Sequence, residues 1–420
     1  MIKIYDMETL EEREILFRGG SGADVSAPVA EILRAVQERG DAALREYTLR
    51  FDGAAPDALV VTAEEVDQAA AQVEPAFLAV LEEAAEHIRA YHARQKRESF
   101  VMTEREGVVL GQRIIPLARV GIYVPGGTAA YPSTVLMNAI PARIAGVGEI
   151  IMVTPPGRDG AVNPHILAAA KIAGVTRIYK VGGAQAVAAL AYGTGTIPQV
   201  DKIVGPGNAY VAEAKRQVFG RVNIDMIAGP SEVLVLADGR SNPAWVAADL
   251  LSQAEHDRMA AARPRKTVAH ELERQLAALP RAEIARASLE ANGKLIVCRD
   301  LREGIAVANR IAPEHLELCV DNPFDYLGEI QNAGSVFLGR YNPEPMGDYF
   351  AGPNHTLPTM GTARFYSPLS VDDFVKKSQF SYYTRDALAR DYRKVSLFAR
   401  KEGLDAHARA VDIRFEGGEA

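Results

Sequence analysis

The stretch Val120-Gly121-Ile122-Tyr123-Val124-Pro125-Gly126-Gly127 joins a short apolar run to a glycine turn, and a helical pattern follows it. Three further strand-like runs, at residues 150–153, 177–181 and 202–204, end in turns that contain glycine. Parallel strands need crossover connections, usually helices, so four strand, turn and helix units in succession indicate a parallel sheet. The sequence therefore predicts an α/β fold.

A second α/β block follows the first. Strand-like runs at residues 233–236, 294–297, 316–318 and 335–338 are separated by helical stretches. Before the first block, residues 26–96 carry apolar side chains at helical spacing. We predict two related α/β domains with parallel sheets, together with N-terminal helices and a helical C-terminal extension.

This pattern divides the chain into three parts. Residues 1–117 and 230–367 are assigned to a discontinuous α/β domain, and residues 118–229 to a domain inserted within it. Residues 368–420 are assigned to a helical segment. That segment carries too little apolar bulk for a core of its own, so we expect it to dock elsewhere.

The composition is typical of a globular protein, since 48% of the 420 residues are hydrophobic and 24% are charged. The formal net charge of −7 gives no basic surface for DNA or RNA, so we expect no nucleic-acid partner. The beginning of the chain lacks the apolar run of a signal peptide, and no apolar stretch of membrane-spanning length follows. We expect a cytoplasmic enzyme with no membrane partner.

The two cysteines, Cys298 and Cys319, lie inside apparent strands. A reactive cysteine needs exposure and a positively charged neighbour, so buried, inert thiols are expected and a catalytic nucleophile is the less favoured alternative. Two cysteines are also too few for a cysteine-rich zinc site. Any bound metal must then be held by histidine, aspartate and amide groups.

Four short segments carry most of the side chains suited to catalysis or metal binding. Four of the eight histidines lie in them, each near a carboxylate or an amide in the sequence. We expect folding to bring them into one site. The segments are Gln253-Ala254-Glu255-His256, Pro313-Glu314-His315, Gly347-Asp348-Tyr349 with Asn354-His355, and Glu402 with His407.

Gln253 and His256 are spaced i, i+3 in a helical stretch and so project from one face. Such a pair more often faces water than a metal, because an amide is an uncommon zinc ligand. Asp348 and His407 have equally plain alternatives. A zinc site is therefore conditional on Gln253, His256, Asp348 and His407 coming together.

Glu314-His315 stands immediately before an apolar strand. Adjacent acid and base groups at the mouth of a strand can carry out two different proton transfers at one reaction centre. A solvated pair of side chains in a loop is the alternative. The residues by themselves leave both interpretations open.

The turn Gly205-Pro206-Gly207-Asn208 follows a strand and opens a helix, as a dinucleotide-binding turn does, but Tyr210 stands where the third glycine belongs. Backbone amides at such helix starts suit a phosphate group. An ordinary βα turn also needs glycine for its geometry. Both interpretations stay open here and at the turns Gly126-Gly127 and Gly182-Gly183.

Taken together and in this order, the motifs resemble those of the L-histidinol dehydrogenase family over residues 26–414. The resemblance rests on residues 120–127, 182–186, 205–208, 229–232, 253–256, 313–315 and 354–359. It implies two incomplete Rossmann-like domains. It also implies the oxidation of L-histidinol to L-histidine through the aldehyde, with two molecules of NAD.

The resemblance assigns the site residues. It implies one zinc ion per subunit, held by Gln253, His256, Asp348 and His407. His315 is implied as the base for the hydroxyl proton, and Glu314 as the group that activates water for the second oxidation. NAD contacts are implied for Tyr123, Gln185 and Asn208. Substrate contacts are implied for Ser231, Gln253, His256, His315, Asp348, His355, Glu402 and His407.

The resemblance further implies a homodimer in which residues 368–420 cross to the other subunit and complete its site. One departure is visible, because after His256-Asp257 the family resumes with a short apolar strand. Residues 258–266 here are polar and small instead, so we expect this strand to be shortened or lost.

Two other functions stay open on the residues alone. A zinc and NAD dehydrogenase of another small alcohol would keep both cofactors and change the pocket. A zinc hydrolase would use Glu314 as a base toward water and would need no nicotinamide. A binding protein without activity is least favoured, because every matched motif position is filled.

Overall fold

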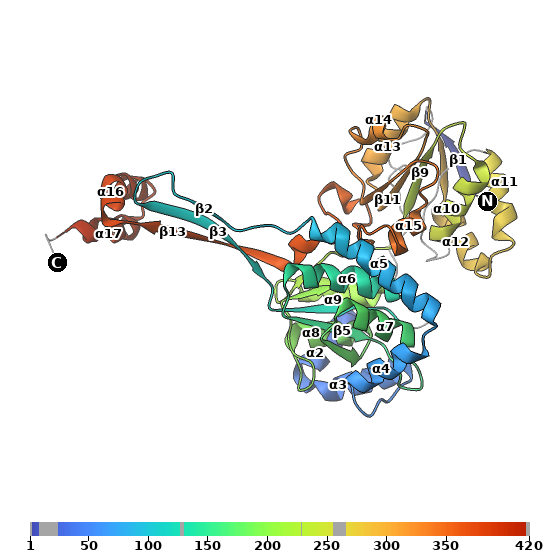
Figure 1. Cartoon of the computed structure of the whole chain (residues 1–420), viewed down its shortest axis with the longest axis horizontal. Helices are drawn as coiled ribbons and strands as arrows, with labels where there is room; N and C mark the ends of the chain where they lie inside the picture. Colours follow the sequence, from blue (N-terminus) through green and yellow to red (C-terminus); the bar gives the residue numbers. More distant parts are fainter. Residues whose placement is uncertain (1, 8–23, 127–129, 228, 255–265, 417–420) are drawn as a thin grey trace. The chain divides into compact units, whose positions relative to one another are not determined.

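The computed structural model describes residues 2–7, 24–126, 130–227, 229–254 and 266–416. Its contacts divide the chain into unit 1, residues 1–96 and 117–374, and unit 2, residues 97–116 and 375–420 (Figure 1). The segment 258–266 lies almost wholly outside the described residues. The shortened strand expected there therefore stays a prediction.

Unit 1 contains a sheet of five parallel strands, with four helices between them along the chain. In spatial order the strands are β6 (Arg177–Lys180), β5 (Glu149–Thr154), β4 (Arg119–Tyr123), β7 (Lys202–Val204) and β8 (Asn223–Ile224). The helices are α6 (Pro132–Ala145), α7 (Pro164–Ala173), α8 (Gly183–Tyr192) and α9 (Ala209–Val218). The strands are largely buried because helices cover both faces of the sheet. The predicted parallel sheet is confirmed.

Four helices precede this sheet in the chain, namely α2 (Ser26–Arg39), α3 (Asp41–Asp52), α4 (Ala63–Gln72) and α5 (Pro75–Ala93). The first two pack on α8, and the other two pack on α7 and α6. The apolar residues spaced for one helical face in α2, such as Val29 and Val36, are buried. This packing joins the N-terminal helices to the five-stranded sheet, whereas the sequence groups them with residues 230–367. The domain boundaries themselves stay predictions.

Asp52, at the end of α3, is a partly buried carboxyl whose protonation affects the stability of this part of the fold. Burial raises the pKa of its carboxyl to about 6, from a usual value of 3.8. Its Oδ2 has no hydrogen-bond partner among the described residues. The negative end of the helix dipole also disfavours the ionised form. The contribution of this carboxyl to the free energy of unfolding is therefore highest at low pH, where the carboxyl is neutral. It falls as the pH rises through 6 and the buried carboxyl must carry a charge.

We expect Asp52→Asn to raise the free energy of unfolding by about 1 kcal/mol at pH 8, after allowance for partial exposure, and to change it little near pH 4. Urea unfolding at both pH values measures the difference. An equal effect at the two pH values would show that the charge of Asp52 is not the cause.

Unit 1 also holds two smaller parallel sheets. One has the order β12 (Ser335–Leu338), β11 (His315–Cys319) and β9 (Val233–Ala237), and the other pairs β1 (Lys3–Asp6) with β10 (Lys294–Val297). The four strands predicted for the second block are all present. The accompanying helices are α10 (Pro243–Ala254), α11 (Lys266–Leu276), α12 (Ala282–Asn292), α13 (Leu301–Ile311), α14 (Phe324–Leu327), α15 (Glu344–Tyr349), η1 (Thr362–Arg364) and η2 (Val371–Phe374).

Unit 2 is a three-stranded antiparallel sheet followed by a pair of helices. The strands have the order β13 (Val375–Tyr383), β3 (Val108–Pro116) and β2 (Phe100–Met102). The helices are α16 (Arg385–Lys401) and α17 (Asp405–Asp412), followed by η3 (Ile413–Phe415). They pack against each other, as the predicted helical extension requires.

The prediction of helix was wrong over residues 375–383. These residues form β13, which pairs with β3 along its whole length, and the two strands run side by side in Figure 1. The physical reason is long-range pairing, because a nine-residue partner strand outweighs the weak local preference of this segment.

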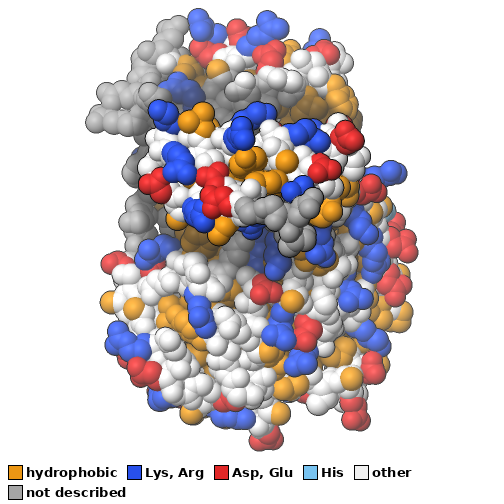
Figure 2. Space-filling view, turned by 90° about the vertical axis from the view of Figure 1, so that its left-hand side faces the viewer, with side chains coloured by type: hydrophobic (Ala, Val, Ile, Leu, Met, Phe, Trp, Pro, Cys, Tyr) orange, Lys and Arg blue, Asp and Glu red, His pale blue; other side chains and the backbone are white. Residues whose placement is uncertain are grey.

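Within the described residues, no helix combines the length and the apolarity needed to cross a membrane. Lysine and arginine side chains are interspersed with aspartate and glutamate on the face shown in Figure 2. Neither sign of charge forms a large continuous field on that face.

Candidate active site

The spatial order of the five-stranded sheet reverses between β4 and β7. In open α/β sheets, ligands bind outside the carboxyl ends of the strands at such a point. A cavity of about 300 Å³ lies there, lined by Pro125 after β4 and by Pro206, Gly207 and Asn208 after β7. Ser231, just before β9, and His315, at the beginning of β11, line it from the three-stranded sheet. The cavity therefore lies between the five-stranded and the three-stranded sheets of unit 1.

Glu314 and His315 are both buried in the wall of this cavity, and the backbone of Glu232 orients them. The Glu232 N–H donates to Oε2 of Glu314 at 2.9 Å. Its carbonyl accepts the His315 N–H at 3.2 Å and lies 3.2 Å from the ring Nδ1. A carbonyl can only accept, so this contact places the proton of neutral His315 on Nδ1 and leaves Nε2 as the basic nitrogen.

Burial raises the pKa of the Glu314 carboxyl well above its usual range, and nearby carboxylates add to this rise. Those neighbours are Glu232, Asp348 and Glu344, while the Glu232 N–H acts in the opposite direction. Of Glu314 and these three neighbours, all except Asp348 are at least nine-tenths buried as whole residues. A cation at this place would favour the charged form of each of them.

The structure brings together two of the four residues predicted to bind zinc. Gln253, near the end of α10, and Asp348, in α15, line the same cavity. The Oε1 of Gln253 is buried without a hydrogen-bond partner among the described residues. Burial raises the pKa of Asp348 to about 6. An orphaned amide oxygen and a buried carboxyl facing one cavity fit a bound cation.

The structure does not test the other two predicted ligands. His256 lies outside the described residues. His407 belongs to α17 of unit 2, where it lines an apolar hollow with Phe398, Leu404, Val411 and the predicted substrate contact Glu402. The parts of His256, His407 and Glu402 in the site therefore stay predictions.

The three predicted NAD contacts stand at the carboxyl end of the five-stranded sheet. Asn208 lines the cavity, and its Oδ1 caps α9 by accepting the N–H groups of the helix start. The Tyr123 hydroxyl accepts the Gly183 N–H at 3.0 Å, and burial raises the pKa of Tyr123 to about 12. Both amide atoms of Gln185 are buried without a partner among the described residues.

Ser231 and His355, the remaining predicted substrate contacts of unit 1, also line the cavity. His355 Nδ1 lies 3.0 Å from the carbonyl oxygen of Asp348, and its Nε2 lies 3.5 Å from Oγ1 of Thr134 in α6. Thr134 lines the cavity as well. Sequence reasoning misses Thr134, because a single threonine in an apolar helix belongs to no motif.

A family model for histidinol dehydrogenase matches residues 18–415. The chain belongs to the histidinol dehydrogenase family. The histidinol dehydrogenase of Syntrophotalea carbinolica is 58% identical over 401 residues, covering 93% of each chain. That of Listeria monocytogenes serotype 4b is 54% identical over 416 residues, covering 97% of each.

A solved histidinol dehydrogenase from Elizabethkingia anophelis has 40% identity and a TM-score of 0.93, covering 99% of this chain and 98% of that one. The fold class and the enzyme class predicted from the motifs are therefore confirmed. As a member of the histidinol dehydrogenase family, the chain is an NAD-dependent oxidoreductase. The family connects it with histidine biosynthesis through histidinol oxidation.

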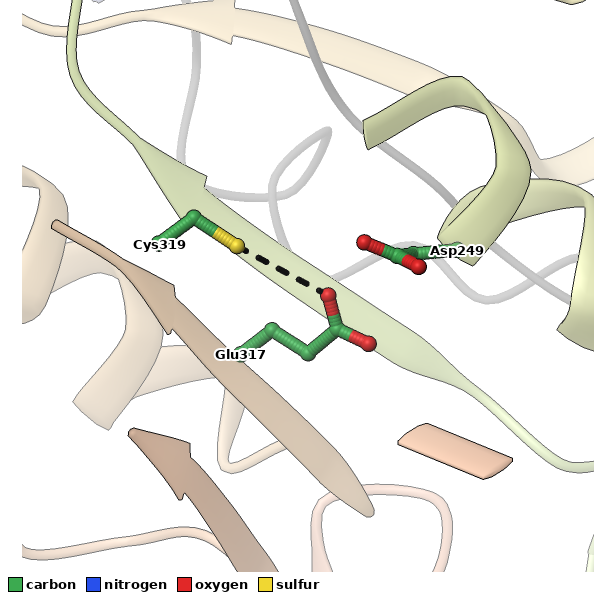
Figure 3. A group of neighbouring side chains, drawn as sticks. All are labelled: Asp249, Glu317 and Cys319. Carbon is green, nitrogen blue, oxygen red and sulfur yellow. Dashed lines mark hydrogen bonds between the residues drawn. The ribbon is translucent and has the colours of Figure 1, made fainter. Parts of the chain in front are cut away.

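This member of the histidinol dehydrogenase family has a buried acidic group whose residues were not among those predicted for the site. His315, Glu317 and Cys319 alternate along β11, and Figure 3 shows the last two beside Asp249 of α10. Burial raises the pKa of Glu317 to about 9 and that of Asp249 to about 6, and the two carboxyls share a hydrogen bond. They therefore hold a proton between them near neutral pH.

This acidic group supports α15, the helix that carries Asp348. Oε1 of Glu317 accepts the Glu344 N–H at the beginning of α15, at 2.8 Å. The thiol of Cys319 faces Oε2 of Glu317 at 3.8 Å. Burial raises the pKa of this thiol, which agrees with the expected inert cysteine. The expectation of a buried strand residue was wrong for Cys298, which is partly buried and directly follows β10. The alternation of polar residues along this apolar strand is the sequence signal that could have indicated the group.

Proposed function

We propose that this enzyme oxidises L-histidinol to L-histidine through the aldehyde, in two successive steps at a zinc centre that each reduce one NAD. The observation that carries the proposal is the composition of one cavity of about 300 Å³. It joins an imidazole with an oriented basic nitrogen, a buried carboxyl and two candidate metal ligands at the switch point of a parallel sheet.

Gln253, His256, Asp348 and His407 would hold the zinc ion, with one ion per subunit. When bound, zinc supplies a Lewis-acidic centre that holds and orients the nitrogen atoms of histidinol. Ser231, His355 and Glu402 would contact the same substrate, and the Glu402 carboxylate suits a cationic amine. Support for the metal comes from the orphaned Gln253 oxygen and from the buried Asp348 carboxyl that lines the same cavity.

In the first oxidation, Nε2 of His315 would take the proton of the substrate hydroxyl while the carbinol carbon loses a hydride. NAD, when bound near Tyr123, Gln185 and Asn208, supplies the hydride acceptor in both oxidations. The product of this step is the aldehyde. The Nδ1 contact with the Glu232 carbonyl keeps the ring in the tautomer that this transfer needs.

In the second oxidation, Glu314 would take a proton from a water molecule as its oxygen adds to the aldehyde carbon. The hydrate then loses a hydroxyl proton to His315 and a hydride to a second NAD, which gives the carboxylic acid. The step needs the carboxylate form of Glu314, which a cation at the cavity would favour and which the Glu232 N–H also stabilises.

We expect about two NADH per histidinol consumed, since each oxidation releases one hydride. Absorbance of NADH, measured together with chromatographic analysis of histidinol, aldehyde and histidine, gives this ratio. One NADH with accumulating aldehyde would contradict the four-electron reaction. Hydrolysis of an ester or amide without NADH would instead support a zinc hydrolase.

We also propose a homodimer in the cytoplasm whose sites are shared between subunits. In support, unit 2 exposes several large apolar side chains, namely Tyr382, Val395, Leu397 and Phe398, and also carries Glu402 and His407. Exposed apolar groups of this kind mark interaction surfaces.

Sharing can be tested by mixing two inactive variants, His315→Asn and His407→Asn. After random subunit exchange about a quarter of wild-type activity should return, because about half the dimers are mixed and half of their sites are intact. Native mass spectrometry of tagged subunits verifies the exchange. No recovery after verified exchange would show that His407 acts within its own chain.

A further inference from the structure

A buried ion pair lies beneath the turn Gly205-Pro206-Gly207-Asn208 and has no part in the proposed chemistry. Lys215 is in α9, and Asp225 directly follows β8. Their side chains are 2% and 1% exposed, and the Lys215 ammonium contacts Oδ1 of the Asp225 carboxylate. The pair is therefore almost completely removed from water.

Both members of the pair hold the backbone of one turn residue. Oδ2 of Asp225 accepts the Gly205 N–H at 2.8 Å, and Nζ of Lys215 donates to the Gly205 carbonyl at 3.0 Å. Oδ1 of Asp225 also accepts the Met226 N–H at 2.6 Å. At the end of β7, the ion pair thus supplies partners that a neighbouring strand would otherwise provide.

The turn is held in a conformation that leaves little freedom. Gly205 has a φ of +108°, and a Cβ there would lie 2.2 Å from the carbonyl oxygen of Tyr123. The turn therefore passes directly against the end of β4. The next three residues, Pro206, Gly207 and Asn208, line the cavity, and Asn208 caps α9. A shift of Gly205 would move all of these groups.

Stability alone accounts poorly for a buried ion pair. Removing two charges from water carries a large desolvation cost, and apolar replacements of similar volume are often neutral or stabilising. The contacts of this pair are concentrated on one cavity-forming turn. Orientation of that turn is therefore the role that the geometry favours.

We infer that Lys215 and Asp225 are positioning residues for the dinucleotide. They fix Gly205 so that the turn and the beginning of α9 present their polar groups to NAD, and they act through the turn rather than through the reacting atoms. The inference rests on the proposed NAD role of Asn208 and its turn. It adds two residues of no recognised motif to the determinants of NAD affinity.

The test is the double variant Lys215→Met/Asp225→Asn, which removes both charges and leaves no unpaired buried one. We expect the KM for NAD to rise at least about tenfold, while kcat changes less than about threefold and the KM for histidinol is unchanged. An unchanged KM for NAD in the folded double variant would overturn the inference.

The matched control is Lys202→Met/Asp373→Asn. Lys202 is 5% exposed, and its Nζ donates to Oδ1 of Asp373 at 2.8 Å, while Asp373 also accepts the Ser370 N–H. Lys202 is the first residue of β7, so this second ion pair lies at the opposite end of the strand from the turn. We expect its removal to leave the KM for NAD within about twofold. An equal rise in both double variants would indicate general loss of structure and would also overturn the inference.

Two further variants keep the test decisive. Asn208→Asp retains a capping oxygen and adds a negative charge, so it raises the KM for NAD if NAD binds at the turn. An unchanged value would refute the NAD placement itself, whereas a rise there without one in the Lys215/Asp225 variant refutes only the positioning role. If this double variant does not fold, Lys215→Gln/Asp225→Asn, which also leaves no unpaired buried charge, should raise the KM for NAD about threefold, since each amide can keep one hydrogen bond to Gly205.

Discussion

The His315→Asn variant should lose about three orders of magnitude in kcat for histidinol oxidation, within the range usual for a general base. Both oxidations should suffer, because the same Nε2 takes the hydroxyl proton of the alcohol and that of the aldehyde hydrate. Single-turnover measurements, begun with histidinol or with the aldehyde, report the two steps separately.

The comparison with Glu314→Gln separates the two adjacent groups. This variant should retain the first hydride transfer and lose most of the aldehyde oxidation, because only the second step needs activated water. His87→Asn is a matched control, since the His87 ring also contacts a backbone carbonyl, that of Phe350, at 2.9 Å but does not line the cavity. Identical single-turnover profiles for Glu314→Gln and His315→Asn would contradict separate roles.

Removal of zinc should leave less than about 1% of the activity, and added zinc should restore it, because metal ligation and substrate orientation are lost together. Gln253→Ala should lower the bound zinc per subunit, measured by plasma mass spectrometry on gel-filtered protein. Loss of the amide oxygen removes a ligand and leaves the cavity otherwise unchanged.

A second buried glutamine provides the control for this experiment. Gln185 also has buried amide atoms without partners among the described residues, but it stands at the five-stranded sheet. Gln185→Ala should therefore retain zinc and weaken only NAD binding. Full activity of a verified metal-free preparation would refute the zinc proposal.

The parallel sheets could be predicted because their signals are local. Each strand of residues 120–204 is a short apolar run closed by a turn that contains glycine, and burial on both faces makes such runs continuous. Glu314 and His315 could be singled out because they stand beside proline at the mouth of such a run. The structure then brings Gln253, Asp348, Ser231 and His355 to the same cavity.

The residues that escaped prediction depend on distant partners. The strand β13 forms because it pairs with β3, and nothing in the sequence of either segment indicates this pairing. Glu317 and Asp249 have high pKa values only because folding buries them together. Lys215 and Asp225 belong to no motif in the sequence, and the fold buries them together beneath the glycine turn.

The pairing of β3 with β13 also bears on the order in which a nascent chain matures. The residues of β3 are synthesised early, but Val108 finds its partner Tyr383 only after almost the whole polypeptide has been made. Until then the edge of β3 that faces β13 has backbone N–H and C=O groups without their strand partner, and such an edge can pair with other chains. If unit 2 completes the catalytic centre of a neighbouring subunit, prematurely terminated translation products cannot turn over histidinol. The long-range strand pairing would thus restrict activity to chains that have been synthesised through β13 and the helices after it.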